Sequence, residues 1–146
     1  MEPITQQLKT VHLFRGLSPA QLERLGGITQ VAHYNTGDVI FRQDDPGDHL
    51  YVITRGQVQV EVTGDDGAPH AAVFLGAGQV FGEMALLDQG PRSATVIAAQ
   101  PGTEVCALAQ AALAALFEQD TGLGYVLMRN LALDLSFKIR HQNFGL

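Results

Sequence analysis

The stretch Gln57-Val58-Gln59-Val60-Glu61-Val62 alternates polar and apolar side chains without a break. Such alternation is typical of a strand with one buried face and one face in water. The next residues, Gly64-Asp65-Asp66-Gly67, have the composition of a tight hairpin turn, since Asp-Gly accepts positive φ values. The apolar run at 71–75 then returns as a partner strand. The centre of the chain is therefore predicted to be an antiparallel hairpin.

Further short strands are predicted on both sides of this hairpin. The apolar runs 39–41, 50–53, 96–99 and 103–108 are each bounded by turn residues, as at 44–48 and 100–102. Several short strands separated by glycine-rich turns favour a small antiparallel barrel or sandwich. The predicted fold class is mainly β with flanking α: an antiparallel β-roll or jelly roll with N-terminal helices and two C-terminal helices.

Helical patterns occupy both ends of the sequence. A short amphipathic helix is predicted over 4–11, and Ser18-Pro19 has the composition of a helix start. An alanine-rich helix at 111–117 precedes a last helix with an apolar row at Leu123, Leu127, Leu131, Leu135 and Ile139. That row predicts packing against the β-roll or the seam of a homodimer. We expect one domain over 1–146, with a helical segment at 1–28, the β-roll at 29–109 and C-terminal helices at 110–146.

Composition excludes several functional classes. The 146 residues carry 46% hydrophobic residues and a formal net charge of −6, and the nine basic residues are scattered. Nucleic-acid binding draws on clustered Lys and Arg, so it is not expected. Cys106 is the only cysteine, which suits a reducing compartment. With neither a secretory signal nor a membrane-length apolar run, the expected location is cytoplasmic.

One stretch, 81–96, combines residues that suit an anionic ligand with hydroxyl groups. It begins Phe81-Gly82-Glu83-Met84-Ala85-Leu86-Leu87 and ends Pro91-Arg92-Ser93-Ala94-Thr95-Val96. Gly82 permits close backbone approach, and the short helical turn after it presents free N–H groups. A carboxylate accepts a sugar hydroxyl well, and a guanidinium binds phosphate in a charge-assisted manner. Glu83 and Arg92 are thus predicted to face a common pocket.

This stretch resembles the phosphate-binding cassette of cyclic nucleotide-binding domains, with the pattern F-G-E-x-A-L-L followed by P-R-[AST]-A-[TS]-V. The segments at 36–43 and 50–58 are also similar to the family, as is the leading segment from Leu13. The sequence departs from the family at Asp44, where glycine is usual. A residue of this type tolerates the left-handed conformation, so the turn rather than the ligand site is affected.

The resemblance implies a cyclic nucleotide sensor with cyclic AMP favoured and cyclic GMP as the alternative. Glu83 would take the ribose 2′-hydroxyl and Arg92 the cyclic phosphate, whereas Gly82, Ala85 and Ser93 would offer backbone N–H groups. Met84 and Ala94 complete the expected ligand-binding set. Leu86 would couple the cassette to the terminal helices, and Tyr125 or Phe137 would form a lid over the base. The expected partner is an effector protein or a fused effector domain outside this chain.

Alternatives remain open from the sequence. Glu83 and Arg92 could form a structural ion pair, and the fold could serve as a protein–protein interaction module that binds no nucleotide. An enzyme is not expected, because Ser93 has neither a glycine elbow nor a nearby histidine. No metal or cofactor is expected, because His12, His33, His49, His70 and His141 lack ligand spacing.

Overall fold

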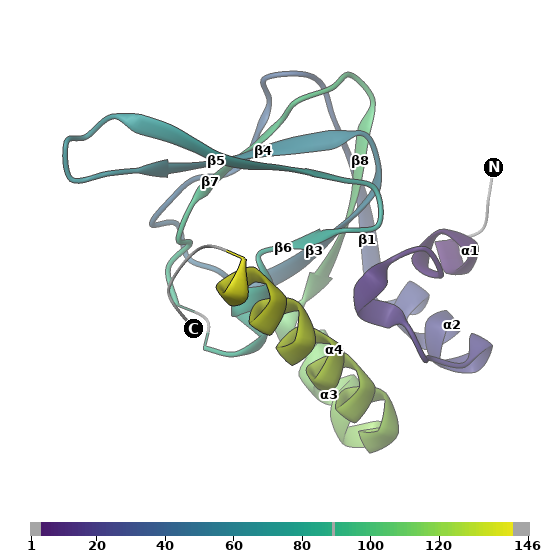
Figure 1. The fold of residues 1–146 in the computed structure, drawn as a ribbon. Coiled ribbons are helices and arrows are strands. Elements are labelled where there is room, and N and C mark those ends of the chain that lie inside the picture. Colours follow the sequence, from purple (N-terminus) through teal and green to yellow (C-terminus); the bar gives the residue numbers. More distant parts are fainter. Residues whose placement is uncertain (1–3, 89, 142–146) are drawn as a thin grey trace.

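The computed structural model describes residues 4–88 and 90–141, without the side chains of 71, 72 and 85, and contains two four-stranded antiparallel sheets (Figure 1). The first sheet has the strand order β1-β8-β3-β6, and the second has the order β2-β7-β4-β5. The strands are β1 (Thr29–Tyr34), β2 (Val39–Phe41), β3 (His49–Arg55), β4 (Gln57–Thr63), β5 (Pro69–Gly76), β6 (Val80–Phe81), β7 (Thr95–Ala98) and β8 (Thr103–Ala109). The predicted antiparallel β-roll is confirmed.

The alternating stretch at the centre of the sequence forms β4, which pairs with both β5 and β7. Gly67 has a φ of 75° and donates a hydrogen bond of 2.9 Å to the carbonyl of Gly64, which closes the predicted hairpin. This β4–β5 hairpin extends away from the rest of the roll on the left of Figure 1. The alternation thus predicted β4 correctly, and the apolar run at 71–75 predicted its partner β5.

Helices precede and follow the roll: α1 (Ile4–Leu8), the 3-10 helix η1 (His12–Phe14), α2 (Pro19–Gly27), α3 (Gln110–Gln119) and α4 (Thr121–Arg140). The hydroxyl of Ser18 accepts a hydrogen bond from the N–H of Gln21, as expected for the start of α2. The first helix is shorter than the predicted 4–11, because it ends at Leu8. Helix α3 lies beside α4, whereas α1 and α2 lie at the side of β1 (Figure 1).

Apolar side chains form two separate cores. The larger core lies between the first sheet and the helices and includes Leu50, Leu108, Leu113, Leu123 and Leu127. The smaller core lies inside the roll and includes Ile53, Val58, Phe81 and Val96. The last helix contributes to the larger core mainly through its first half, since its buried residues are Leu123, Gly124, Leu127, Asn130 and Leu131. The four leucines of the predicted apolar row on α4 thus pack against their own domain, whereas Ile139 is 42% exposed.

Three local features differ from the sequence expectations or extend them. Strands β1 and β6 were not predicted; β1 is a half-exposed edge strand and β6 has only two residues. Asp44 has a φ of 75° and is the one non-glycine residue with positive φ in the described ranges, as the expected turn requires.

Among the helices that the structure describes, none combines the length and apolarity needed to cross a membrane.

Candidate functional site

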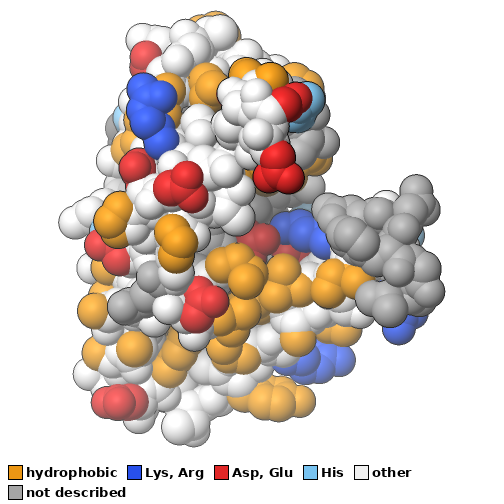
Figure 2. Space-filling view, turned by 90° about the vertical axis from the view of Figure 1, so that its left-hand side faces the viewer, with side chains coloured by type: hydrophobic (Ala, Val, Ile, Leu, Met, Phe, Trp, Pro, Cys, Tyr) orange, Lys and Arg blue, Asp and Glu red, His pale blue; other side chains and the backbone are white. Residues whose placement is uncertain are grey.

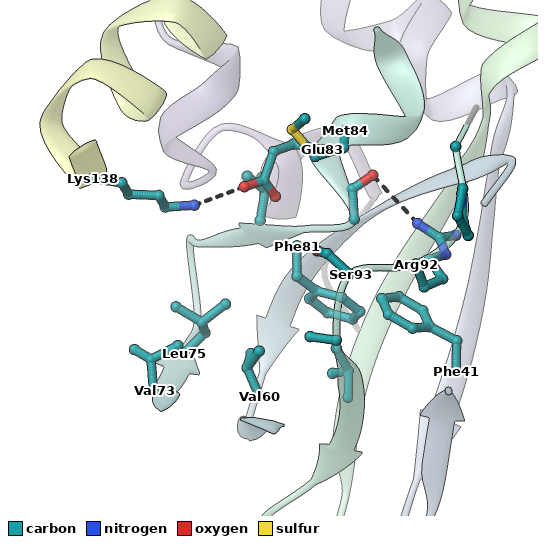
Figure 3. A pocket seen from close by; sticks show the side chains of 16 residues that line it. Phe41, Val60, Val73, Leu75, Phe81, Glu83, Met84, Arg92, Ser93 and Lys138 are labelled. Carbon is teal, nitrogen blue, oxygen red and sulfur yellow. Dashed lines mark hydrogen bonds and ion pairs between the residues drawn. The ribbon is translucent and has the colours of Figure 1, made fainter. Parts of the chain in front are cut away.

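A cavity of about 230 Å³ lies beside the stretch 81–96 and is lined by residues of both sheets (Figure 3). Its apolar wall includes Phe41, Val60, Leu75 and Phe81, and its charged lining residues are Glu83, Arg92 and Lys138. Gln89 falls within the predicted cassette but lies outside the described residues, as do the segments 1–3 and 142–146. The cavity combines a hydrophobic interior with a few charged groups, which is usual for a small-molecule site.

Gly82 positions the first part of the site. It adopts the left-handed conformation, with φ 72° and ψ 19°, and directly precedes the 3-10 helix η2 (Glu83–Leu86). A Cβ at this position would lie 2.7 Å from Nη1 of Arg92 and 3.2 Å from the carbonyl oxygen of His49. Glycine is therefore needed both for the backbone conformation and for the space next to the guanidinium.

The backbone of Arg92 is fixed by an adjacent turn. Its N–H donates to the carbonyl of Asp45 at 2.8 Å, and its carbonyl accepts from the N–H of Asp44 at 2.8 Å. Pro91 forms a bridge with Pro46, so the two segments run side by side. The unusual turn at Asp44 thus holds Arg92 in place.

The guanidinium of Arg92 is almost fully buried, with 7% of the residue exposed. Nη2 donates to the carbonyl of His49 at 2.9 Å, and Nη1 donates to the carbonyl of Gly82 at 3.5 Å (Figure 3). Its central carbon lies 4.1 Å from the ring centroid of Phe41 and 5.6 Å from that of Tyr51. These aromatic faces stabilise the cation that the backbone carbonyls orient.

Arg92 is nevertheless incompletely satisfied. Its Nε is buried and has no hydrogen-bond partner among the described residues, and no carboxylate there forms an ion pair with the guanidinium. Burial lowers the pKa of Arg92 from its ordinary value, while Tyr51 and Asp48 oppose that effect. A buried cation with unused donors is costly without an anion, so the site is suited to a negatively charged ligand.

Glu83 does not pair with Arg92, contrary to the structural alternative left open by the sequence. Its Oε1 accepts a hydrogen bond of 2.9 Å from Nζ of Lys138 on α4 (Figure 3). Nζ also lies 3.1 Å from Oδ2 of Asp134, one helical turn earlier. Burial disfavours the charged form of Lys138, but Glu83 and Asp134 outweigh it and raise the pKa of that amine.

Lys138 is the functional candidate that the sequence analysis missed. It lies 55 residues from Glu83, and no local pattern connects the two positions. The spacing of Asp134 and Lys138 predicts an ion pair along one helix face, but it gives no indication that the helix end reaches the cavity.

The other predicted residues lie as follows. Met84 and Ser93 are exposed and line the cavity, as does Ala94. Ala85 lies in η2, and its side chain is outside the described part of the chain. Leu86 is partly buried and packs against the larger core, which includes leucines of α3 and α4.

The two lid candidates do not cover the cavity in this conformation. Tyr125 is 68% exposed near the start of α4, roughly 20 Å along the helix axis from Lys138. Phe137 is 61% exposed, stacks on His141 with ring centroids 3.9 Å apart, and lines a neighbouring cavity. A lid role for either residue stays a prediction.

Hydrophobic side chains gather across the face of the molecule shown in Figure 2, and acidic and basic side chains meet beside them. Among the described residues, no group of three or more His, Cys, Asp and Glu side chains is arranged to hold a metal ion. Together, the fold and this site define a β-roll domain with a pocket for a small, partly apolar anion.

The family follows from comparison with known proteins. Residues 31–120 match the model of the cyclic nucleotide-binding domain, and the chain belongs to this family. It is 34% identical over 139 residues to the cyclic AMP receptor protein of Thermus thermophilus, covering 95% of this chain and 62% of that protein. It is 36% identical over 103 residues to the cGMP-dependent protein kinase egl-4 of Caenorhabditis elegans, covering 69% of this chain and 13% of the kinase.

A solved structure of a cyclic nucleotide-binding domain from Methylobacillus flagellatus is similar in fold. Its TM-score is 0.83 at 27% identity, and the match covers 95% of this chain and 78% of that chain. The present chain spans less than two thirds of the length of the receptor protein and a small part of the kinase.

Proposed function

We propose that this domain is a sensor that binds a cyclic nucleotide, with cyclic AMP favoured over cyclic GMP, and transmits binding to α4. Arg92 binds the cyclic phosphate, and Glu83 accepts the ribose 2′-hydroxyl. The backbone N–H groups of Gly82, Ala85 and Ser93 complete the polar end of the site, and Met84 and Ala94 lie against the ligand. The proposal for cyclic AMP draws on the receptor protein named above, which covers most of this chain.

The observation that carries the proposal is the state of Arg92. Arg92 lines the cavity, its guanidinium is oriented by two carbonyls and by Phe41, and its buried Nε has no hydrogen-bond partner among the described residues. A cyclic phosphate supplies one negative charge and oxygen acceptors for such a group. The apolar wall around Phe81 and Val60 offers a surface for the remainder of the nucleotide.

Transmission would run from the cassette to the C-terminal helices. Leu86, at the end of η2, packs against the core that contains Leu123 and Leu127 of α4. A ligand that shifts the cassette changes this packing, and a ligand moves an equilibrium only by binding one arrangement more tightly than the other. The effector, a separate protein or a fused domain, would respond to α4.

One observation favours the alternative function, a fold kept for protein–protein contact. Glu83 has a charged partner within the protein, Lys138. If the fold serves only for protein–protein contact, Lys138 would occupy the carboxylate of Glu83 permanently, and no nucleotide would bind.

Titration calorimetry with cyclic AMP, cyclic GMP and linear 5′-AMP tests these functions. We expect cyclic AMP to bind more tightly than cyclic GMP, and linear 5′-AMP, which carries a larger charge and an open phosphate, to bind least. If neither cyclic nucleotide binds below about 1 mM, which corresponds to roughly −4 kcal/mol, the sensor function is wrong and the interaction module is favoured.

A further inference from the structure

A second cavity, of about 540 Å³, adjoins the cavity beside the cassette. Both are lined by Val73, Leu75, Val80 and Lys138, so they lie next to each other. Figure 3 shows Lys138 above Val73 and Leu75, where its side chain reaches from α4 to Glu83. The two cavities are therefore neighbouring parts of one hollow between the β-roll and α4.

The cavity beside the cassette is too small to enclose a whole nucleotide. Its volume of about 230 Å³ lies below the roughly 300–1,000 Å³ that is usual for small-molecule sites. With the phosphate at Arg92 and the ribose at Glu83, the base has to extend into the second cavity. The apolar lining of that cavity, which includes Leu75, Val80 and Leu133, suits the faces of a purine. Helix α4 then lies over the base, as the lid predicted from the sequence requires.

One face of α4 supplies polar groups to the second cavity. Asn130, Asp134 and Lys138 are spaced by four residues, so they lie in a row along the helix, and all three line the cavity. The amide nitrogen of Asn130 is already used, since it donates to the carbonyls of Leu13 and Arg15 at 2.7 and 2.9 Å. The charged groups of the row are those of Asp134 and Lys138, at the end nearer the cassette.

Asp134 and Lys138 place an acceptor beside a donor. Oδ2 of Asp134 is buried and lies 3.1 Å from Nζ of Lys138, whereas 38% of the Asp134 side chain is exposed, so Oδ1 is the accessible acceptor. An ammonium has three donors; one is directed to Oε1 of Glu83 at 2.9 Å and one to Asp134, which leaves the third for a ligand. Lys138 can keep both contacts when a nucleotide binds, because the second oxygen of Glu83 remains for the ribose hydroxyl.

Adenine matches this pair of groups. Its amino group at C6 donates, and the ring nitrogen beside that group accepts. Guanine carries an oxygen acceptor at C6, so a guanine in the same position would set a carbonyl oxygen against the carboxylate. An acceptor that faces another acceptor loses its hydrogen bond with water and gains none. A base held in one position is therefore accepted with an amino group at C6 and disfavoured with an oxygen there.

We propose that Asp134 selects cyclic AMP by accepting a hydrogen bond from the amino group of adenine, and that Lys138 positions the carboxylate of Asp134. This inference rests on the proposed function, because it requires a nucleotide with its phosphate at Arg92. It derives the preference for cyclic AMP from a side chain of α4 rather than from a relative.

Calorimetry with three ligands that differ at C6 of the base tests the proposal. They are cyclic AMP, the cyclic monophosphate of purine riboside, which lacks the amino group, and cyclic IMP, which carries an oxygen in its place. The wild type should bind cyclic AMP about 5- to 20-fold more tightly than the purine analogue, and cyclic IMP most weakly.

Substitutions on α4 should change these ratios. In Asp134→Asn the preference for cyclic AMP over cyclic IMP should fall to about twofold or less, because a carboxamide offers either an acceptor or a donor. Lys138→Met should also reduce the preference, because the carboxylate loses the contact that orients it. Asp65→Asn, the same chemical change at an exposed turn, is the matched control and should keep the wild-type ratios.

The ratio within one variant separates specificity from folding, because a loss of stability weakens the binding of all three ligands alike. An unchanged ratio in Asp134→Asn or in Lys138→Met would overturn the role assigned to that residue. A wild type that binds the purine analogue as tightly as cyclic AMP would overturn the whole inference, and the sensor function would stand. If the wild type binds no cyclic nucleotide, the proposed function is wrong, and the role of Asp134 is wrong with it.

Discussion

Arg92 and Glu83 face the same cavity, but different parts of the molecule hold them. Arg92 is held within the β-roll, by carbonyls of the β3 start and the cassette and by the ring of Phe41. Glu83 lies on a short 3-10 helix, and its carboxylate is bound by Lys138 from the end of α4. Arg92 is 7% exposed and has no ionic partner in the part of the chain that the structure describes, whereas Glu83 pairs with Lys138.

If the domain is the proposed sensor, this difference would separate affinity from response within a single small site. The aromatic rings of Phe41, Tyr51 and Phe81 connect β2, β3 and β6 beneath Arg92, with centroid distances of 5.0–5.8 Å. A guanidinium fixed by such packing loses little freedom on binding, which favours affinity. Under the proposed function, a ligand hydroxyl at Glu83 would have to share or replace the contact from Lys138 on α4, and a change there would be one that an effector could detect. Substitutions at Arg92 and at Glu83 should therefore have separable effects on ligand binding.

The largest effect is expected for Arg92→Ala. Loss of the phosphate contact should weaken cyclic AMP binding by about 1.5–3 kcal/mol, or roughly 10- to 150-fold, measured by calorimetry. Arg42→Ala, at an exposed position close to the same turn, is the matched control and should bind normally. A thermal melt must first show that Arg92→Ala is folded, because the side chain also packs on Phe41. Unchanged affinity in a folded variant would assign Arg92 to structure alone.

Gly82→Ala should have the next largest effect, since it directly disturbs the backbone and the space next to the guanidinium of Arg92. An alanine with positive φ costs about 1–2 kcal/mol, and its Cβ would also lie 2.7 Å from Nη1 of Arg92. Gly67→Ala is a close control, because Gly67 has a φ of +75° and no atom within 4 Å of an added Cβ. Denaturant unfolding should show a similar backbone penalty in both variants. Only Gly82→Ala should also lose nucleotide affinity, and equal affinities would contradict the close fit around the guanidinium.

A smaller effect is expected at Glu83, to which the ribose hydroxyl is assigned. 2′-Deoxy cyclic AMP should bind the wild type about 0.5–1.5 kcal/mol more weakly than cyclic AMP, because it lacks the hydroxyl assigned to Glu83. Glu83→Ala should not distinguish the two nucleotides. Loss of the ion pair with Lys138 affects the titrations of Glu83→Ala with both nucleotides equally. Its contribution therefore cancels when the difference between the two nucleotides is compared in the variant and in the wild type. A persistent preference for the hydroxyl in Glu83→Ala would place the ribose elsewhere in the cavity.

Features of the fold that depend on local sequence were predictable, whereas features that depend on contacts between distant residues were not. Alternation in Gln57–Thr63 identified β4, and the apolar face of this strand reaches the smaller core through Val58 and Val60, whereas Val62 is exposed. Strand β6 has only Val80 and Phe81, too few residues for a period to be visible. Strand β1 is exposed along much of its length as an edge strand, so it lacks a clear apolar face.

The same division applies to the site. The spacing of Gly82, Glu83 and Arg92 within one stretch indicated that they face one cavity, and the structure brings all three to it. The burial of Arg92 against Phe41 depends on pairing between sheets, and the contact of Lys138 depends on where a 20-residue helix ends. Neither arrangement has a local signature in the sequence. The part of the site within the cassette was therefore partly predictable, whereas the contact from the end of α4 was not.

The smallest effect on binding is expected from Glu104, at the end of the first sheet away from the cavity. Its carboxylate accepts from Oγ1 of Thr54 at 2.7 Å and lies 2.9 Å from Nε2 of His33. The hydrogen bond from Thr54, followed by that from His33, lowers the pKa of Glu104 below its ordinary value of 4.5 although burial opposes this. A lowered pKa in the folded state means that the stabilisation is complete above pH 4.5 and is lost as the pH falls through the folded value.

Glu104→Gln should therefore lower the free energy of unfolding by about 1 kcal/mol at pH 7, and the difference from the wild type should shrink as the pH falls below 4.5. Glu118→Gln, on the exposed face of α3, removes the same charge and should change stability little. Cyclic AMP affinity should stay the same in both variants, because β3 carries Arg55 opposite Glu104 and His49 at its other end. A loss of affinity in Glu104→Gln as large as that caused by removing the ribose hydroxyl would mean that the roll transmits distant changes to Arg92. The position of Arg92 would then depend on distant parts of the molecule as that of Glu83 does, and the contrast between the two residues would not hold.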